Sequence, residues 1–99
     1  MKLSDAKRLF FGLRAENRVE VCEEHVIGAH PERAYTVDEV ISLIRASGIF
    51  QDSTDPKYLG ERFYWRIKDV TENDVRLVIE FDEDEDGQLI LVVSAGERQ

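Results

Sequence analysis

Residues 75–94, VRLVIEFDEDEDGQLILVVS, carry the clearest structural signal in this chain. Seven residues rich in β-branched and aliphatic side chains precede an acidic turn, and seven more follow it. The turn ends in Asp86 and Gly87, a dipeptide typical of β-hairpins. The sequence therefore predicts two antiparallel strands, Val75–Phe81 and Gln88–Ser94, and the rest of the chain is expected to extend or cover the sheet that they form.

A third strand is predicted over residues 62–68, because polar and apolar side chains alternate there. Its apolar side consists of Phe63, Trp65 and Ile67, and its polar side consists of Arg62, Tyr64, Arg66 and Lys68. In the first arm of the hairpin the same period of two sets Arg76, Val78 and Glu80 opposite the apolar side. One face of the sheet is thus expected to be cationic.

Two helices are predicted. The first covers residues 4–15, where Ser4 is a good N-cap and apolar residues recur at helical spacing. The second begins at Thr36, which forms a capping box with Glu39, and Gly48 stands where a left-handed C-cap residue belongs. The apolar face of the second helix, expected to lie on the sheet, consists of Val37, Val40, Ile41 and Ile44.

Shorter segments complete the order of elements. Residues 18–22 alternate as a short strand does, residues 23–31 can form one or two helical turns that loosen before Pro31, and residues 53–60 are rich in loop-forming residues. Residues 1–99 are expected to form a single α+β domain. Its two main helices pack on one face of a four- to five-stranded antiparallel sheet.

The composition, 42% hydrophobic and 34% charged, is typical of a soluble globular protein. No apolar run is long enough to span a membrane, and the charged N-terminus is unlike a signal peptide. The single cysteine, Cys22, cannot form an internal disulfide, which fits a reducing compartment. We therefore expect a cytoplasmic protein that does not associate with membranes.

The net charge of −8 lies almost entirely in the second half of the chain, where residues 52–99 carry 13 acidic against 6 basic side chains. Residues 82–86 alone supply five of the acids. Nucleic-acid binding requires phosphates to be neutralised by Lys and Arg, so this balance argues against strong non-specific binding to RNA or DNA. A local cationic face is still compatible with it.

The order of elements and several short motifs together resemble a poorly characterised bacterial family within the broad RelE-like group of small toxin-type ribonuclease folds. The motifs are residues 18–21 (RVEV), 24–25 (EH), Arg33, 36–40 (TVDEV), 48–49 (GI), 77–79 (LVI) and 89–93 (LILVV). The resemblance covers most of the chain. It implies a pair of helices on one side of a twisted sheet, with any RNA site on the other side.

The resemblance also matches individual residues. His25 corresponds to the family's histidine after the first strand, and Arg33 corresponds to a basic position before the capped helix. The chain departs from related sequences at residues 94–96 (SAG), where a threonine and an aromatic residue are usual, and in its acidity. The domain implied is therefore either a ribonuclease or a relative that has lost the activity, and the sequence leaves open whether it is an enzyme.

The cationic face is the main candidate site. Its basic residues Arg62, Arg66, Lys68 and Arg76 suit RNA phosphates or a protein partner, and Tyr64 suits a stacked base. In a ribonuclease of this type the catalytic residues would be His25 or Tyr64, moving protons, and Arg66, stabilising charge on the phosphate. Two other interpretations remain: an ordinary solvated sheet face, and a non-catalytic module that binds a protein such as an antitoxin.

No cofactor or metal is expected. His25 and His30 are not spaced as a zinc-binding pair on a helix, and only one cysteine is present. The turn from Asp82 to Gly87 resembles the opening of a calcium loop, but position 12 of that loop is Val93 instead of a bidentate glutamate. The alternative is an acidic hairpin tip that discourages pairing between sheet edges.

Overall fold

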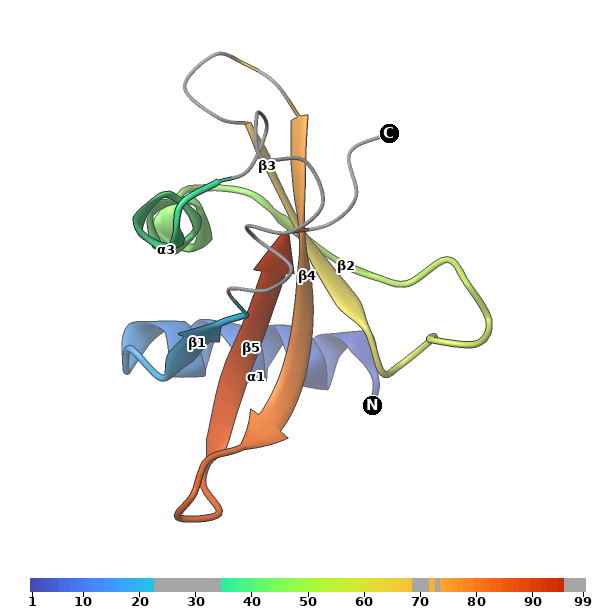
Figure 1. Ribbon diagram of the computed structural model, residues 1–99. Helices are drawn as coiled ribbons and strands as arrows, with labels where there is room; N and C mark the ends of the chain where they lie inside the picture. The colour runs from blue at the N-terminus through green and yellow to red at the C-terminus, as the bar shows by residue number, and fades with distance from the viewer. Residues whose placement is uncertain (23–34, 69–71, 73, 96–99) are drawn as a thin grey trace.

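The predicted hairpin lies at the centre of the fold (Figure 1). The computed structural model describes residues 1–22, 35–68, 72 and 74–95. In it β4 (Asp74–Glu83) pairs antiparallel with β5 (Leu89–Ala95). β4 continues beyond its predicted arm into the acidic segment as far as Glu83, so the turn itself is short, and Gly87 has the positive φ of 76° that its bend requires. The hairpin prediction is confirmed.

The sheet has five strands in the order β1-β5-β4-β3-β2. β3 (Phe63–Lys68) pairs with β4, and β2 (Ile49–Asp52) forms the edge beside β3. β1 (Val19–Val21) forms the other edge and runs parallel to β5. The sheet is therefore mixed, and the prediction of a purely antiparallel sheet was wrong. Alternation of side chains does not encode strand direction, and no tight turn joins β1 to β5.

Both described helices pack on one face of the sheet. The side chain of Trp65 contacts each of them: its ring centroid lies 4.8 Å from that of Phe10 in α1 (Leu3–Ala15), and its indole N–H donates to the carbonyl of Leu43 in α3 (Val37–Arg45) at 3.0 Å. In Figure 1, α1 crosses behind the strands and α3 lies beside it, seen end-on. The predicted two-layer α+β architecture is confirmed in this form.

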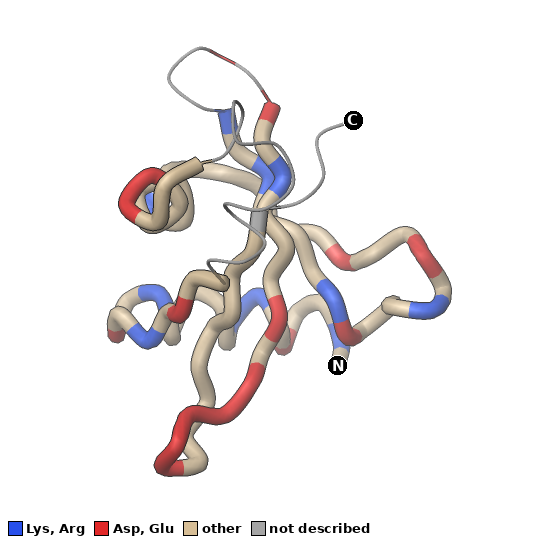
Figure 2. Tube along the Cα trace, in the orientation of Figure 1, with Lys and Arg blue, Asp and Glu red and all other residues tan. Residues whose placement is uncertain are grey.

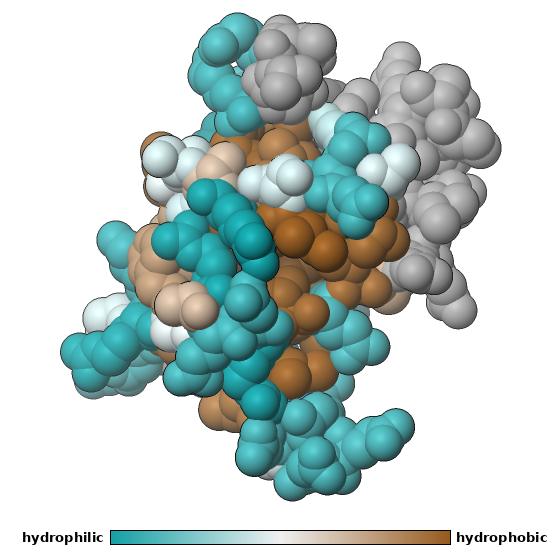
Figure 3. Space-filling view, turned by 90° about the vertical axis from the view of Figure 1, so that its left-hand side faces the viewer, coloured by the Kyte–Doolittle hydropathy of each residue, from teal (hydrophilic) through white to brown (hydrophobic). Residues whose placement is uncertain are grey.

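The core fills the space between these layers. Its aromatic centre is made by Phe10 and Phe50, whose centroids are 5.0 Å apart, and by Phe63 and Trp65. Aliphatic side chains from α1, α3, β3, β4 and β5 surround it: Leu13, Val40, Ile44, Ile67, Val75, Leu77, Ile79, Leu91 and Val93. Apolar side chains also gather on the side of the molecule that carries β1 (Figure 3), where Val19 and Val21 are half-buried.

Details at the helix ends differ from the prediction. α1 begins at Leu3, and its N-cap is Lys2 without a side-chain hydrogen bond, so the predicted cap at Ser4 was wrong. The capping box of Thr36 and Glu39 is confirmed, with both of its hydrogen bonds at 3.2 Å.

Ile41, expected to face the sheet, is 37% exposed, because only a narrow stripe of this nine-residue helix contacts the core.

Gly48 is not the left-handed C-cap that the sequence predicted. α3 ends with Ala46 as an extended C-cap, and Gly48 has no positive φ. The reason for glycine is close approach: a Cβ atom at this position would lie 2.5 Å from the carbonyl oxygen of Arg66 and 2.5 Å from Cγ2 of Ile67. Gly48 thus lets the chain enter β2 directly against β3.

Among the helices that the structure describes, none is both long enough and apolar enough to cross a membrane.

Candidate nucleic-acid interface

We call the sheet surface turned away from α1 and α3 the outer face. Its described side chains include Glu20, Gln51, Tyr64, Arg66, Lys68, Arg76, Val78, Glu80, Ile90 and Val92. The alternation predicted for β3 is present, with Phe63, Trp65 and Ile67 buried toward the helices. Arg76, in the first half of β4, is the basic residue of that strand, and Figure 2 shows the acidic run at the hairpin tip.

Two arginines face each other at the basic end of the outer face. Arg66 of β3 is the direct cross-strand partner of Arg76 of β4. Both side chains are exposed, and neither takes part in an ion pair with any residue in the described part of the chain. Like charges in directly opposed positions destabilise a sheet. This pair is therefore a concentrated positive charge that the described residues do not balance.

Tyr64 positions one of these guanidinium groups. The Cζ atom of Arg76 lies 4.4 Å from the centroid of the Tyr64 ring, within the range of a cation–π interaction. The tyrosine is half-buried between its cross-strand neighbours Val78 and Gln51. One face of its ring is thus occupied by Arg76, so a nucleotide base could stack on the exposed guanidinium plane.

Arg62 is separated from the arginine pair by its own contacts. Its Cζ atom lies 4.0 Å from the ring centroid of Tyr58, and its Nε lies 3.8 Å from Oε1 of Glu80. The Nε atom is buried and has no hydrogen-bond partner among the residues that the structure describes. The structure therefore divides the predicted cluster: Arg66 and Arg76 lie together, whereas Arg62 is held beside Glu80 and the loop that precedes β3.

Of the remaining predicted site residues, some lie on the outer face and others lie outside the described residues. Lys68 continues the basic side of β3 and pairs in register with Asp74, which supplies an acidic neighbour at the end of the sheet. His25 and Arg33 lie outside the described residues, so the structure does not bear on the histidine. Of the three predicted catalytic residues, Tyr64 and Arg66 are brought onto the same face, two positions apart in β3.

Sequence reasoning missed the contribution of β2. Gln51 pairs with Tyr64, and Ile49, which is 60% exposed, pairs with Arg66. The amide of Gln51 adds a neutral donor and acceptor to an otherwise ionic surface. The alternation of Ile49, Phe50 and Gln51 was the available signal, although a four-residue strand gives little of it.

The acidic turn is structured by its own backbone. Oδ1 of Asp84 accepts the N–H groups of Asp86 and Gln88, each at 2.9 Å, and Oδ2 accepts from Arg18 at 2.8 Å. The Gln88 N–H is the largest cause that holds the pKa of Asp84 below its ordinary value, and the Arg18 guanidinium and the Asp86 N–H add to it. Burial opposes them, with an effect second in size to that of the Gln88 N–H. The carboxylate that a calcium loop would use is thus already hydrogen-bonded.

Within the described ranges, no group of three or more His, Cys, Asp and Glu side chains is arranged to hold a metal ion. The Asp84 contacts have a structural role instead, because Arg18 also donates to the carbonyl of Leu89 at 2.9 Å. The side chain of Arg18, immediately before β1, thereby ties the parallel edge strand to the hairpin turn.

Comparison with known proteins gave no family model, no curated protein and no solved structure that matches this chain.

Proposed function

We propose that the chain is a RelE-like toxin-family domain whose outer face binds single-stranded RNA, with the phosphate held between Arg66 and Arg76. The observation that carries the proposal is the direct opposition of these two arginines without a described carboxylate partner. A phosphate between two guanidinium groups accepts charge-assisted hydrogen bonds from both and removes their repulsion. A role on RNA also fits the cytoplasmic location expected from the sequence.

Neighbouring residues have distinct roles in this proposal. Lys68 lies two residues beyond Arg66 along β3, about 7 Å away, and extends the positive strip to a second phosphate. Gln51 and the Arg76 guanidinium, held over Tyr64, contact a base by hydrogen bonding and stacking. The net charge of −8 keeps such binding local, because the rest of the surface repels a polyanion.

If the domain cleaves RNA, Arg66 stabilises the charge that develops on the scissile phosphate, and Tyr64 or His25 transfers protons. The proposal for catalysis rests on the family resemblance and on the adjacency of Tyr64 and Arg66 on β3. Binding and cleavage are separate properties, and a relative that has lost cleavage would keep the first.

Binding is tested by fluorescence anisotropy with a labelled single-stranded RNA. We expect Arg66→Gln and Arg76→Gln each to weaken binding, and Arg62→Gln to weaken it less, because Glu80 offsets the charge of Arg62. Lys7→Gln is the matched control, since it removes a positive charge from α1 on the other side of the sheet. Contact with two or three phosphates predicts a slope of log K against log salt between about −1.4 and −2.1.

Two results would reject RNA binding: no association at low salt, or a Lys7→Gln variant that loses as much affinity as Arg66→Gln. Cleavage is followed separately on gels with the same RNA. In that assay Arg66→Gln and Tyr64→Phe should abolish product if the face is catalytic. Product that persists in both variants rejects the proposed catalytic residues.

A non-catalytic protein-interaction module is the second candidate. Apolar side chains adjoin the arginine pair, namely the exposed Ile49, which pairs in register with Arg66, and the half-buried Val78, two residues from Arg76 in β4. A mixture of arginine and apolar groups is typical of protein interfaces. This function predicts that Arg66→Gln weakens binding to an antitoxin-like protein encoded by a neighbouring gene, measured by calorimetry, while RNA does not bind.

A further inference from the structure

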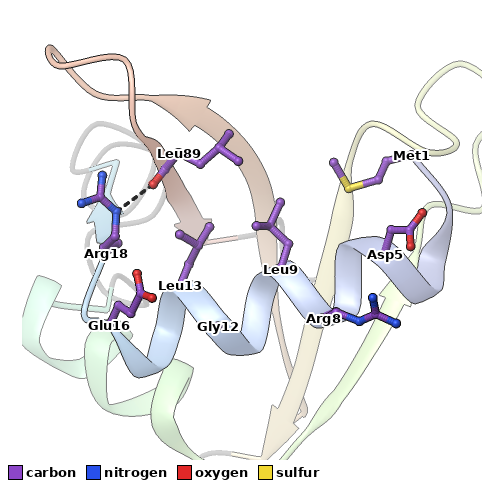
Figure 4. A pocket seen from close by; sticks show the side chains of 9 residues that line it. All are labelled: Met1, Asp5, Arg8, Leu9, Gly12, Leu13, Glu16, Arg18 and Leu89. Atoms are coloured by element: carbon purple, nitrogen blue, oxygen red, sulfur yellow. Dashed lines mark hydrogen bonds between the residues drawn. The ribbon is translucent and has the colours of Figure 1, made fainter.

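A groove runs along α1 on the opposite side of the molecule from the outer face, between the helix and the start of β5 (Figure 4). Leu9 and Leu13 form its apolar floor. Two more apolar side chains lie toward its ends, Leu89 at 44% exposure and Met1 at 56% exposure. The groove thus combines exposed apolar surface with an open helix face.

The charged residues of the groove are distributed symmetrically about Gly12. Arg8 precedes Gly12 by four residues and Glu16 follows it by four, so each lies about 6 Å from it along the helix axis. Farther out, Asp5 lies at one end of the groove and Arg18 at the other (Figure 4). Each end therefore carries one acidic and one basic residue, in reversed order.

The apolar residues lie along one edge of the groove. In Figure 4, Leu13 and Leu89 lie on one side of Gly12, and Leu9 and Met1 lie on the other, all along the edge nearer the sheet. Of the charged residues, a rotation of 180° about an axis through Gly12, perpendicular to the helix, superposes Arg8 on Glu16, which has the opposite sign. A surface with this property is complementary to itself.

Gly12 makes close contact possible at the axis of this symmetry. Apart from its chain neighbours and the backbone of its own helix, no described atom lies within 4 Å of the position that its Cβ would occupy, so the helix surface is open there. Glycine is less favourable than alanine inside a helix, and no contact within the described structure requires it at this position. Between two helices, the missing side chain permits the shorter interaxial distances.

We propose that the groove binds a second copy of this chain, with the two α1 helices antiparallel and crossing at Gly12. Arg8 of each copy pairs with Glu16 of the other. Arg8 and Glu16 take part in no ion pair within the described part of the chain, so their charges are free for these contacts. The proposal is independent of RNA binding.

The experiment is sedimentation equilibrium of the full chain from micromolar to millimolar concentration. We expect a monomer–dimer equilibrium. Arg8→Glu sets two carboxylates against each other at both ends of the interface and should raise the dimer Kd at least about tenfold. Combining Arg8→Glu with Glu16→Arg in one chain reverses both charges, and it should restore the wild-type Kd.

Two further variants separate the interface from folding. Gly12→Gln introduces a better helix former whose side chain fills the crossing point, so circular dichroism should report a folded monomer that no longer dimerises. Lys7→Glu makes the same charge change as Arg8→Glu next to the groove and should leave the Kd unchanged. A chain that stays monomeric at millimolar concentration overturns the proposal. A dimer whose Kd in both Arg8→Glu and Gly12→Gln equals the wild-type Kd overturns it too.

Discussion

Arg66 of β3 lies directly opposite Arg76 of β4, and among the described residues neither guanidinium has a carboxylate partner. The fold therefore sets two like charges in directly opposed positions at the place where the proposed phosphate binds. Sites that are arranged for a ligand commonly retain such local costs, because the ligand removes them. The repulsion has a measurable consequence for stability that does not depend on any assay of function.

Arg66→Gln should raise the free energy of unfolding by about 0.2 to 1 kcal/mol at low salt, since it removes the like-charge pair. The gain should decrease at high salt, because ions screen the repulsion between exposed groups. Urea unfolding of both proteins at the two salt concentrations measures the difference. A variant less stable than wild type at low salt would show that Arg66 has a stabilising partner in the folded protein.

Gly48→Ala and Gly12→Ala form a matched pair with opposite expected signs. The methyl group at position 48 would collide with the carbonyl of Arg66 and with Ile67, in a strand that is paired on both sides and cannot shift freely. We expect the free energy of unfolding of Gly48→Ala to fall by roughly 1 to 3 kcal/mol. At position 12 the methyl group enters open space on a helix, and we expect a gain of up to about 1 kcal/mol.

Thermal or urea unfolding at a concentration below the dimer Kd measured by sedimentation gives both values. Equal changes in the free energy of unfolding for the two substitutions would contradict the close approach of Gly48, in the segment between α3 and β2, to β3. The comparison also tests why the predicted C-cap role of Gly48 was wrong, since a left-handed glycine and a sterically required glycine respond differently. Gly48→Asn would be tolerated in the first case only.

The parts of the fold that the sequence predicted correctly depend on local patterns. The period of two in β3 and in the hairpin is a property of neighbouring residues, and so is the capping box of Thr36 and Glu39. β1 was assigned to an antiparallel sheet because its partner could not be identified. Its direction follows from hydrogen bonds between distant segments, such as the Leu91 N–H to the Arg18 carbonyl at 2.9 Å.

The site was predictable to a similar extent. Alternation placed Arg62, Tyr64 and Arg66 on one face, but it could not say which arginines would meet across the strands. The pairing of Arg66 with Arg76 depends on the register of β3 and β4, and a shift of one residue would turn one arginine to the other face. The contact of Arg62 with Tyr58 could not be predicted from the alternation either, because Tyr58 lies in a loop.

Trp65 joins the sheet to both helices, and its indole N–H is the polar part of that junction. Trp65→Phe removes the indole donor from the part-buried carbonyl of Leu43, which keeps the Ala46 N–H at 3.2 Å, and it creates a small cavity in the core. We expect the free energy of unfolding to fall by about 1 to 3 kcal/mol or somewhat more. Tyr64→Phe, the neighbouring substitution on the outer face, keeps the ring beneath Arg76 and should change stability by less than about 0.5 kcal/mol.

Far-UV circular dichroism during urea unfolding reports both variants without relying on tryptophan fluorescence. If the Tyr64→Phe variant were the less stable of the two, the assignment of Trp65 to the core and Tyr64 to the outer face would have to be reversed.

Asp84 gives the stability of the protein a defined dependence on pH. Hydrogen bonds from the N–H of Gln88 and from Arg18 hold its pKa in the folded protein below the ordinary aspartate value of 3.8. The folded state therefore binds the proton more weakly than the unfolded state does. This contribution to stability is complete above the unfolded pKa, and it is lost as the pH falls through the folded pKa.

Asp84→Asn removes the titrating group and its ion pair with Arg18, which ties β1 to the hairpin. The variant should be less stable than wild type at neutral pH, and the difference should shrink as the pH falls below about 4. Urea unfolding at a series of pH values measures it. Glu85→Gln removes an exposed acid from the same turn and is the control. If the free energies of unfolding of Asp84→Asn and wild type differed by the same amount down to the acid transition, the charge of the Asp84 carboxylate would not stabilise the folded protein.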